Sequence, residues 1–289
     1  MSVDDVTTTR TSQPRGIPGR ASLRLLASEL RLIAGRRRNQ AGVLVLASVP
    51  ILVAVSLKFT QPRRGRGPDF LSDATSNGVF VALTALSIEL ALFLPLAVAA
   101  LSGDTIAGEA NIGTLRYLLT VPVHRTRLLA VKYVSLVIGG CFALVVVAGT
   151  GVVVGGILFG LGPTTLLSGT QIGIGDALVR LALAVLYLSV GLAGLAAIGL
   201  FVSTLTEQPI AAMIAVTVVS TAMWILDAIP QLSWLQPWLL VHYWPAFSDV
   251  FRDPMFFDQM RQGVLVAVAY AVVFLSLAWA RFSQKDITS

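Results

Sequence analysis

Long apolar runs separated by short polar segments dominate the chain, and each run is long enough to cross a bilayer as a helix. A spanning helix needs roughly 20 apolar residues for a hydrocarbon core of about 30 Å. The runs are continuously apolar, which favours helices over the alternating strands of a barrel. The pattern predicts six spans, near residues 41–58, 79–102, 132–160, 177–204, 209–228 and 263–281. We therefore expect an all-α polytopic membrane protein.

A polar tail and an amphipathic segment precede the first span. Residues 1–20 contain almost no large apolar residue, so we expect a disordered tail followed by one transmembrane domain over residues 21–289. Within 22–38, apolar residues recur at steps of three and four between arginines, at Leu23, Leu26, Leu30 and Ile33. This spacing favours a helix lying in the headgroup plane. A plain extension of the first span is the alternative.

The segment before the last span is rich in aromatic residues. Residues 229–262 hold eight of the 23 aromatic residues of the chain, which predicts short helices at the outer membrane interface. An aromatic substrate gate is the alternative. At the outer end of the fourth span, Asp176 and Arg180 are four residues apart and are expected to pair.

Small residues spaced by four mark packing faces in the third and fourth spans. They occur at Gly151 and Gly155, at Gly156 and Gly160, and at Ala193 and Ala197. Residues four apart lie on one face of a helix, where small side chains let a second helix approach closely. The spacing does not identify that second helix.

The distribution of charge predicts the orientation in the membrane. Hydrophobic residues make up 55% and charged residues 12% of the chain, mean hydropathy is +0.80, and the formal net charge is +6. With the N-terminus inside, 14 of the 21 Lys and Arg residues fall on the cytoplasmic side, which predicts that both termini are cytoplasmic. The basic residues flank spans and do not alternate with stacking aromatics, so they indicate contact with membrane lipid and not with nucleic acid.

Residue types that carry metal, redox or nucleotide chemistry are sparse. The two histidines, His124 and His242, fall on opposite predicted faces of the membrane, and the single cysteine, Cys141, lies inside a span. We therefore expect no metal and no internal disulfide. None of the three lysines stands in the GxxxxGK[ST] pattern that cradles nucleotide phosphates, so any ATP hydrolysis belongs to another polypeptide. No nucleophile and base are spaced as in an enzyme, and we expect no catalytic residues.

Glu89 is the exceptional polar residue of the predicted spans. It lies near the middle of the second span, where a carboxylate costs several kcal/mol unless it is neutral, paired or hydrated. It is a candidate for a translocation path, and a hydrogen-bonded packing role is the equal alternative. Pro95, six residues later, predicts a kink in the same helix.

The polar loop between the second and third spans carries the most specific sequence pattern. Residues 108–132 read GEANIGTLRYLLTVPVHRTRLLAVK, a Glu followed by GTLRYLL, a Pro-containing turn and basic residues entering the next span. This segment resembles the first cytoplasmic loop of ABC-2 type transporter permeases. The matching positions are Glu109, Gly113, Thr114, Leu115, Arg116, Leu118, Leu119, Pro122, Val123, Arg125, Leu128, Leu129 and Lys132.

The resemblance implies an exporter subunit of a multi-pass type in the bacterial plasma (inner) membrane. Two copies of the permease and two copies of a separate ABC ATPase would form the working unit, with ATP and magnesium bound only by the ATPase. Residues 103–131 would dock on the ATPase, with coupling residues Glu109, Gly113, Thr114, Leu115, Arg116, Pro122, Val123 and Arg125. A loop that packs under its own bundle is the alternative.

Two other function classes stay open from the sequence. An ion-coupled secondary transporter or channel would use Glu89 as its proton or ion site and need no ATPase. A membrane-embedded lipid enzyme would need a polar cluster at one interface, for which the outer carboxylates Asp249, Asp253 and Asp258 are the candidates.

Overall fold

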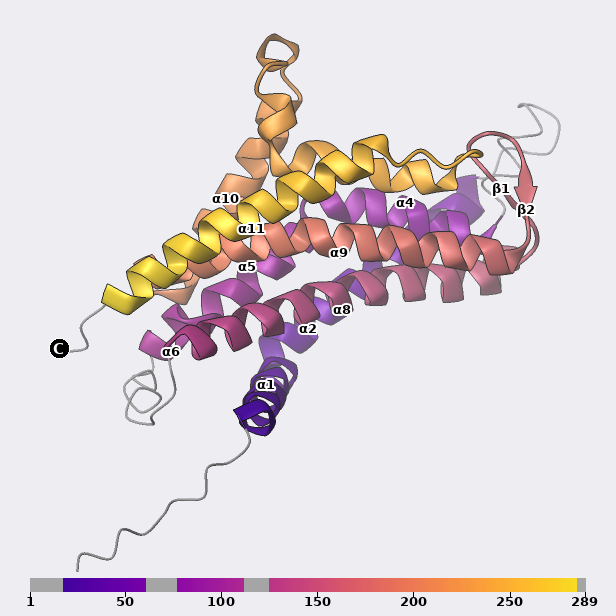
Figure 1. The fold of residues 1–289 in the computed structure, drawn as a ribbon. Helices are drawn as coiled ribbons and strands as arrows, with labels where there is room; N and C mark the ends of the chain where they lie inside the picture. The colour runs from indigo at the N-terminus through magenta and orange to yellow at the C-terminus, as the bar shows by residue number, and fades with distance from the viewer. Residues whose placement is uncertain (1–17, 61–76, 112–124, 285–289) are drawn as a thin grey trace, which may run out of the picture.

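The chain folds into an elongated bundle of long helices (Figure 1). The computed structural model describes residues 18–60, 77–111 and 125–284. Within these residues, five helices are long and apolar enough to cross a membrane, and a bent pair makes a sixth if it is counted as one span. The five are α2 (Arg37–Thr60), α8 (Arg125–Phe159), α9 (Ile174–Leu205), α10 (Pro209–Asp227) and α11 (Asp258–Gln284). The expectation of an all-α polytopic membrane protein is confirmed at this level.

The predicted second span is broken into two helices. Helix α4 (Gly78–Ala91) and helix α5 (Phe93–Thr105) meet at Leu92 with a bend of 55°. Pro95 explains the position, because a proline has no N–H to donate to the carbonyl four residues earlier, here that of Ala91. The kink that Pro95 predicted in this helix is confirmed, and the break lies three residues before the proline.

Shorter elements connect the long helices. Helix α1 (Pro18–Gly35) precedes α2, and α6 (Ala107–Asn111) follows α5. Strands β1 (Thr164–Thr165) and β2 (Gln171–Ile172) form a small antiparallel hairpin between α8 and α9. The 3-10 helices η1 (Pro230–Leu232), η2 (Gln236–Trp238) and η3 (Leu240–Phe251) lie between α10 and α11, where short helices were predicted. The hairpin was not predicted, and α1 includes residues 18–20, which were assigned to the tail.

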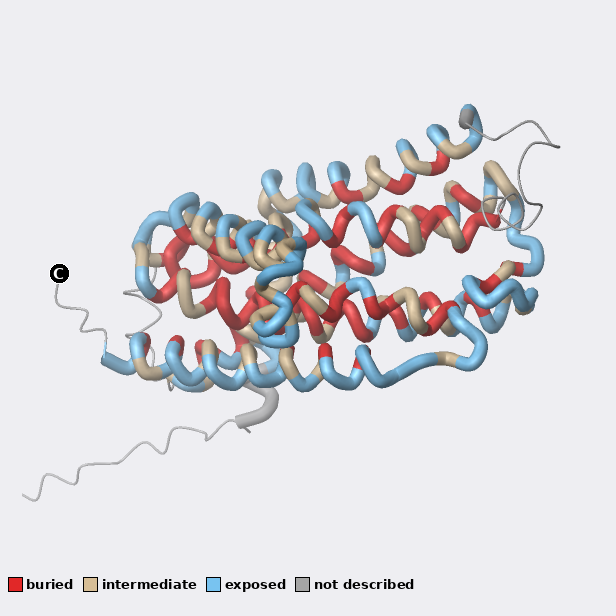
Figure 2. Tube along the Cα trace, turned by 90° about the horizontal axis from the view of Figure 1, so that it is seen from above, coloured by how far each residue is buried: buried red, intermediate tan, exposed pale blue. Residues whose placement is uncertain are grey.

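Helix α9 is the central element of the bundle. In its most apolar stretch 61% of residues are buried, against 17% in α2, α10 and α11. Its neighbours include α11, α8, α5 and η3. Figure 2 shows the buried residues concentrated between the helices and the exposed ones along their outer sides. The outer sides are themselves rich in Leu, Ile and Val, as expected of surfaces that face lipid.

Helices α4 and α8 approach each other through glycines. A Cβ atom added to Gly155 would lie 2.5 Å from the carbonyl oxygen of Gly78, and one added to Gly151 would lie 2.5 Å from Cα of Ala82. The spacing of Gly151 and Gly155 predicted a packing face on α8. The structure identifies α4 as the helix that packs against it.

Many of the helix ends lie at the two ends of the bundle, while the end of α10 projects away from both (Figure 1). At one end, the start of α2, the end of α5, α6, the starts of α8 and α10 and the ends of α9 and α11 lie together (Figure 1). At the other, the start of α4 is tied to the end of α8, where the Asn77 side chain donates to the carbonyls of Gly162 and Pro163 at 2.8 and 3.1 Å. The same side chain caps α4 by accepting from the amide of Val79.

The aromatic residues of 229–262 divide into two sets. Four pack inside the bundle, namely Tyr243, Trp244, Phe247 and Phe251, and four are exposed, namely Trp234, Trp238, Phe256 and Phe257. The Tyr187 hydroxyl of α9 donates to the Tyr243 carbonyl at 2.5 Å, which fixes η3 to the central helix. The sequence predicted short helices here, which the structure has, and it did not predict that four of their aromatic residues are buried in the bundle.

Arg180 also fixes this segment to α9. Its guanidinium donates to the carbonyls of Val250 and Arg252 at 2.6 and 2.8 Å. The predicted partner was Asp176, one turn earlier on the same helix. The backbone of η3 takes that place, so the arginine joins two elements instead of stabilising one.

Candidate functional site

A buried ionic cluster lies at the base of the predicted coupling loop. Lys132 near the start of α8 places its Nζ 2.6 Å from Oε1 of Glu109 on α6, and 3.3 and 3.4 Å from the carboxylate oxygens of Glu29 on α1. Lys132 is 1% exposed, and both glutamates are 8% exposed. Three elements that are distant in the sequence thus meet at one ammonium group.

The electrostatics of this cluster are unbalanced. Two carboxylates face one ammonium, and a buried charge is costly unless it is paired and hydrogen-bonded. Burial raises the pKa of Glu109 above its ordinary value, while the ammonium of Lys132 and, more weakly, the guanidinium of Arg36 act against that rise. The negative charge of Glu29 adds to the increase in pKa. Protonation of Glu109 is therefore the change that most directly relieves the cluster.

A second ionic group lies beside the first. Asp104 near the end of α5 accepts from Arg36, between α1 and α2, and from Arg38 of α2, the latter at 2.5 Å. Arg38 also donates to the carbonyl of Ala100 at 2.9 Å. These contacts tie the corner between α1 and α2 to the end of α5. The broken span and the N-terminal helix are thereby joined directly.

The start of α6 is fixed to the central helix. The hydroxyl oxygen of Ser203 on α9 accepts from the amides of Ile106 and Ala107 at 3.2 and 2.9 Å. These amides belong to the first residue of α6 and the residue before it, and N–H groups at a helix start have no acceptor within the helix. Ser203 is fully buried. Glu109 therefore stands on a helix whose N-terminus is held in place.

The far side of the loop is fixed to the last helix. Arg125, the first residue of α8, donates to the carbonyls of Phe282 and Ser283 at 3.2 and 2.8 Å. One residue on, the hydroxyl of Thr126 accepts from Nε1 of Trp279 on α11 at 3.0 Å. The described ends of the loop thus attach to α1 and α9 on one side and to α11 on the other.

The structure places some of the predicted coupling residues and not others. Glu109 and Arg125 are described and lie in the contacts above. Gly113, Thr114, Leu115, Arg116, Pro122 and Val123 lie outside the described residues. Further along the matching segment, Leu128 and Leu129 are buried in the bundle, and Lys132 joins the ionic cluster.

Sequence reasoning missed the role of Glu29. It lies three residues after Leu26 and four before Ile33, on the face that the spacing predicted to be apolar. A glutamate on such a face needs a buried cation, and Lys132 supplies it. The spacing indicates that Glu29 lies on the apolar face. It does not indicate that its cation is Lys132, 103 residues away in the sequence.

Glu89 is fully buried in the last turn of α4, three residues before the break. Its side chain is 0% exposed, and within the described residues neither carboxylate oxygen has a hydrogen-bond partner. The hydrogen-bonded packing role therefore has no support among these residues. An uncompensated carboxyl at this depth is a functional candidate.

The outer carboxylates pair with separate partners. Asp227 Oδ1 lies 2.6 Å from Nδ1 of His242, and Asp249 Oδ1 lies 3.0 Å from Nε of Arg252. Asp253 is within 3.5 Å of the Thr170 hydroxyl. Among the described residues no group of three His, Cys, Asp or Glu side chains is arranged to hold a metal ion. Of the residues proposed for a lipid enzyme, Asp249 and Asp253 thus contact different partners.

Comparison with known proteins gives one family. A family model described as "Protein of unknown function (DUF2705)" matches residues 49–288, which include the second half of the predicted first span and all the later ones. No curated protein matches the chain.

Proposed function

The chain belongs to the DUF2705 family of proteins of unknown function, and we propose that it is the membrane-spanning subunit of an ABC-2 type exporter. A separate ATPase would supply ATP hydrolysis, and this chain would move a substrate across the plasma membrane. The working unit would hold two copies of the chain and two of the ATPase, with ATP and magnesium bound by the ATPase. Both termini of the chain would be cytoplasmic.

The arrangement of the helices supports this proposal. The helix ends that flank residues 112–124 lie at the end of the bundle that the Lys and Arg distribution predicts to be cytoplasmic. A docking loop for a soluble ATPase has to lie on that side. The helix α1, with its arginines and apolar face, would lie along the same surface.

The contact between Glu109 and Lys132 is the observation that carries the proposal. Both residues belong to the segment that resembles the permease loop, and at 2.6 Å they close its base. Through Glu29 the same ammonium holds α1, and through α6 the loop meets α5 and α9. A force applied to the loop therefore reaches α1, α5 and α8 together.

This chain would contribute a conformational change and not a chemical reaction. Closure of the ATPase pair would displace the loop, shift α6 against α8 and tilt the two halves of the broken span, which opens a path outward. Glu89 would lie near that path, at the break between α4 and α5.

Affinity purification in mild detergent tests the proposal. The protein, expressed with its native partners, is expected to retain an ATPase that mass spectrometry identifies by its nucleotide-binding sequence and an activity assay confirms. Arg116→Ala, and Glu109→Gln, which keeps the shape of the side chain, are expected to lower ATPase retention or activity. Asp249→Asn, which breaks an ion pair in the outer segment, serves as the matched control.

Two results would overturn the exporter proposal. One is a folded, purified protein that retains no ATPase under any of these conditions. The other is an ATPase retained equally by wild type, Arg116→Ala and Glu109→Gln. A thermal unfolding curve for each variant separates a lost contact from a lost fold.

An ion-coupled transporter or channel is the second candidate, and the buried carboxyl of Glu89 is the observation that favours it. In that case purified protein in liposomes would carry flux driven by a pH gradient without any ATPase. Glu89→Gln would abolish that flux. For the exporter, Glu89→Gln is expected to change transport while leaving ATPase retention intact.

A further inference from the structure

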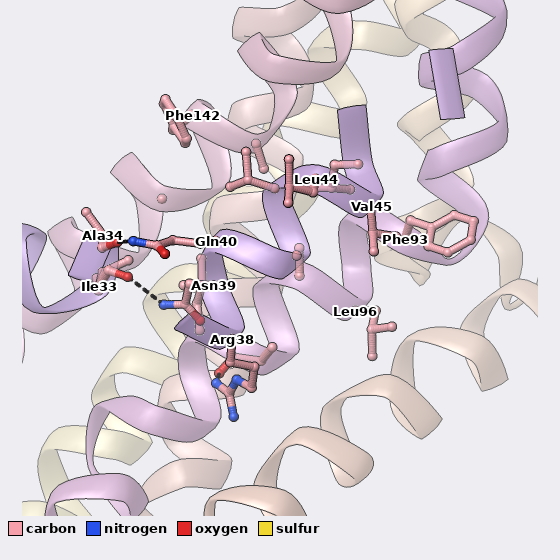
Figure 3. Close-up of a pocket in the computed structure, with 18 of the residues that line it drawn as sticks. Ile33, Ala34, Arg38, Asn39, Gln40, Leu44, Val45, Phe93, Leu96 and Phe142 are labelled. Carbon is pink, nitrogen blue, oxygen red and sulfur yellow. Dashed lines mark hydrogen bonds between the residues drawn. The ribbon is translucent and has the colours of Figure 1, made fainter. Parts of the chain in front are cut away.

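A deep groove lies beside the corner between α1 and α2. It has a volume of about 820 Å³, within the range of small-molecule sites, and is lined by residues of α1, α2, α5 and α8 with one residue of α10. Figure 3 shows Leu44 and Val45 of α2, Phe93 and Leu96 of α5 and Phe142 of α8 around it. Most of the lining is aliphatic or aromatic.

The polar residues of the groove are clustered at the start of α2. They are Arg38, Asn39 and Gln40. The side-chain amide of Asn39 donates to the Ile33 carbonyl at 2.9 Å, and the side-chain amide of Gln40 donates to the Ala34 carbonyl at 3.0 Å (Figure 3). These amides close the last turn of α1. Because the side chains of Asn39 and Gln40 are bonded to α1, the charged group at the polar end of the groove is the guanidinium of Arg38.

Three consecutive arginines lie at or beside this end of the groove. Arg36, Arg37 and Arg38 are consecutive, and the first and third share the single carboxylate of Asp104. Arg37 is exposed and is not part of that pairing. Arg38 lines the groove, and the exposed Arg37 next to it in sequence adds a second guanidinium group near the polar end of the groove.

The apolar walls continue onto surfaces that face lipid in a membrane protein. Leu44 is 72% exposed and Phe142 is 56% exposed, and both lie on helices apolar enough to span a membrane. From Arg38 to Leu46 the groove extends along α2 for about 12 Å. A ligand that fills it needs an anionic group at one end and a hydrocarbon chain entering from the membrane at the other.

We propose that this groove binds an anionic phospholipid from the surrounding membrane, with its phosphate at Arg38, next to the exposed Arg37, and an acyl chain along α2 between α5 and α8. Charge complementarity selects the anionic headgroup, because basic pockets between spans bind such lipids. The apolar length of the groove selects a chain. The site does not depend on an ATPase and stands independently of the exporter proposal.

Gly42 provides a direct test of the groove. It lines the groove, and a Cβ atom added there meets nothing within 4 Å. Gly42→Leu therefore fills the groove without displacing the packing of the protein. Gly149 on α8 is exposed, also has open space around it and is not among the lining residues. Gly149→Leu is the matched control.

The experiment measures which lipid stays bound. Protein is reconstituted in nanodiscs of equal phosphatidylglycerol and phosphatidylcholine, extracted by dilution into detergent and examined by native mass spectrometry. Wild type and Gly149→Leu are expected to retain phosphatidylglycerol in preference to phosphatidylcholine. Arg37→Gln is expected to reduce that retention about fivefold, the effect of one basic residue near a membrane surface. Gly42→Leu is expected to abolish it.

Three outcomes would overturn the proposal. Equal retention of the two lipids removes the charge selection, and unchanged retention in Gly42→Leu moves the lipid to another place. The third is a second copy of the chain in the groove. Leu44→Cys in a Cys141→Ala background would then form a disulfide-linked dimer in the membrane, and efficient crosslinking would assign the groove to that contact.

Discussion

Gly155 of α8 packs directly against Gly78 of α4, so that a Cβ atom on Gly155 would lie 2.5 Å from the Gly78 carbonyl oxygen. The contact involves backbone on both sides, which leaves no flexible side chain to move away. It also joins the third span to the beginning of the broken one, beside the cap formed by Asn77. The distance between these two helices is thus set by the lack of side chains.

Gly155→Val is expected to destabilise the protein by about 1–3 kcal/mol, the usual cost of inserting methyl groups into a packed interior. The measurement is the thermal unfolding midpoint in detergent. Gly149→Val is the control on the same helix, since a Cβ atom there meets nothing within 4 Å. Equal midpoints for the two variants would show that α4 and α8 are less closely packed than described.

Lys132→Met is expected to cost roughly 3–5 kcal/mol, because it leaves the buried carboxylates of Glu29 and Glu109 without their shared ammonium. The triple variant with Glu29→Gln and Glu109→Gln is expected to recover most of that loss, since it removes the buried charges together. Denaturation in detergent measures both. A triple variant as unstable as Lys132→Met alone would argue against an electrostatic role for the cluster.

The stability of the folded protein is expected to contain a contribution from Glu109 that decreases as pH rises. Burial raises the pKa of Glu109 in the folded state above the 4.5 of an unperturbed glutamate, so the folded state binds more protons than the unfolded one above that value. Protonated Glu109 stabilises the fold at low pH, and this contribution is lost as pH rises through the folded-state pKa. Unfolding midpoints measured from about pH 5 to about pH 8 show the slope.

Glu109→Gln is the variant that isolates this effect, because its amide does not titrate. Its unfolding midpoint is expected to depend less steeply on pH than that of wild type. Asp249→Asn is expected to keep the wild-type slope. Parallel slopes for wild type and Glu109→Gln would contradict the raised pKa.

Arg180→Gln is expected to loosen the segment before α11 from α9. The guanidinium donates to two carbonyls at once, those of Val250 and Arg252, and a hydrogen bond from a charged group contributes about 1.5–3 kcal/mol. Limited proteolysis near residue 252 is expected to be faster in the variant, while the far end of the bundle stays protected. Proteolysis at the wild-type rate would show that η3 is held mainly by Tyr187 and its buried aromatics.

Hydropathy alone predicted the long helices, because a continuous apolar run has few alternatives in a membrane protein. Hydropathy misplaced the helix starts where the helices extend into polar sequence. Helix α8 begins at Arg125, seven residues before the predicted start, and α11 begins at Asp258 instead of residue 263. The hydrogen bonds of a helix continue through polar residues when tertiary contacts such as those of Arg125 hold them.

The candidate site was predictable only in part. Glu109 and Lys132 were identified through a resemblance, but their direct contact was not predicted. Glu29, Asp104 and Ser203 join the site through pairings between residues far apart in sequence, which no local pattern encodes. Likewise, the spacing of the glycines of α8 predicted a packing face, but only the structure shows that α4 packs against it.

The two sides of residues 112–124 lead into mechanically different structures. On one side, α6 and α5 run to a break at Leu92, where the Ala91 carbonyl has no amide donor at Pro95, so this route bends by 55°. On the other, α8 is one unbroken helix of 35 residues, about 52 Å long, against a hydrocarbon core of about 30 Å. Under the exporter proposal, a displacement at Arg125 would act on one continuous helix that reaches Gly155 and leads to the hairpin, whereas a displacement at α6 would act on a span that is broken at Leu92.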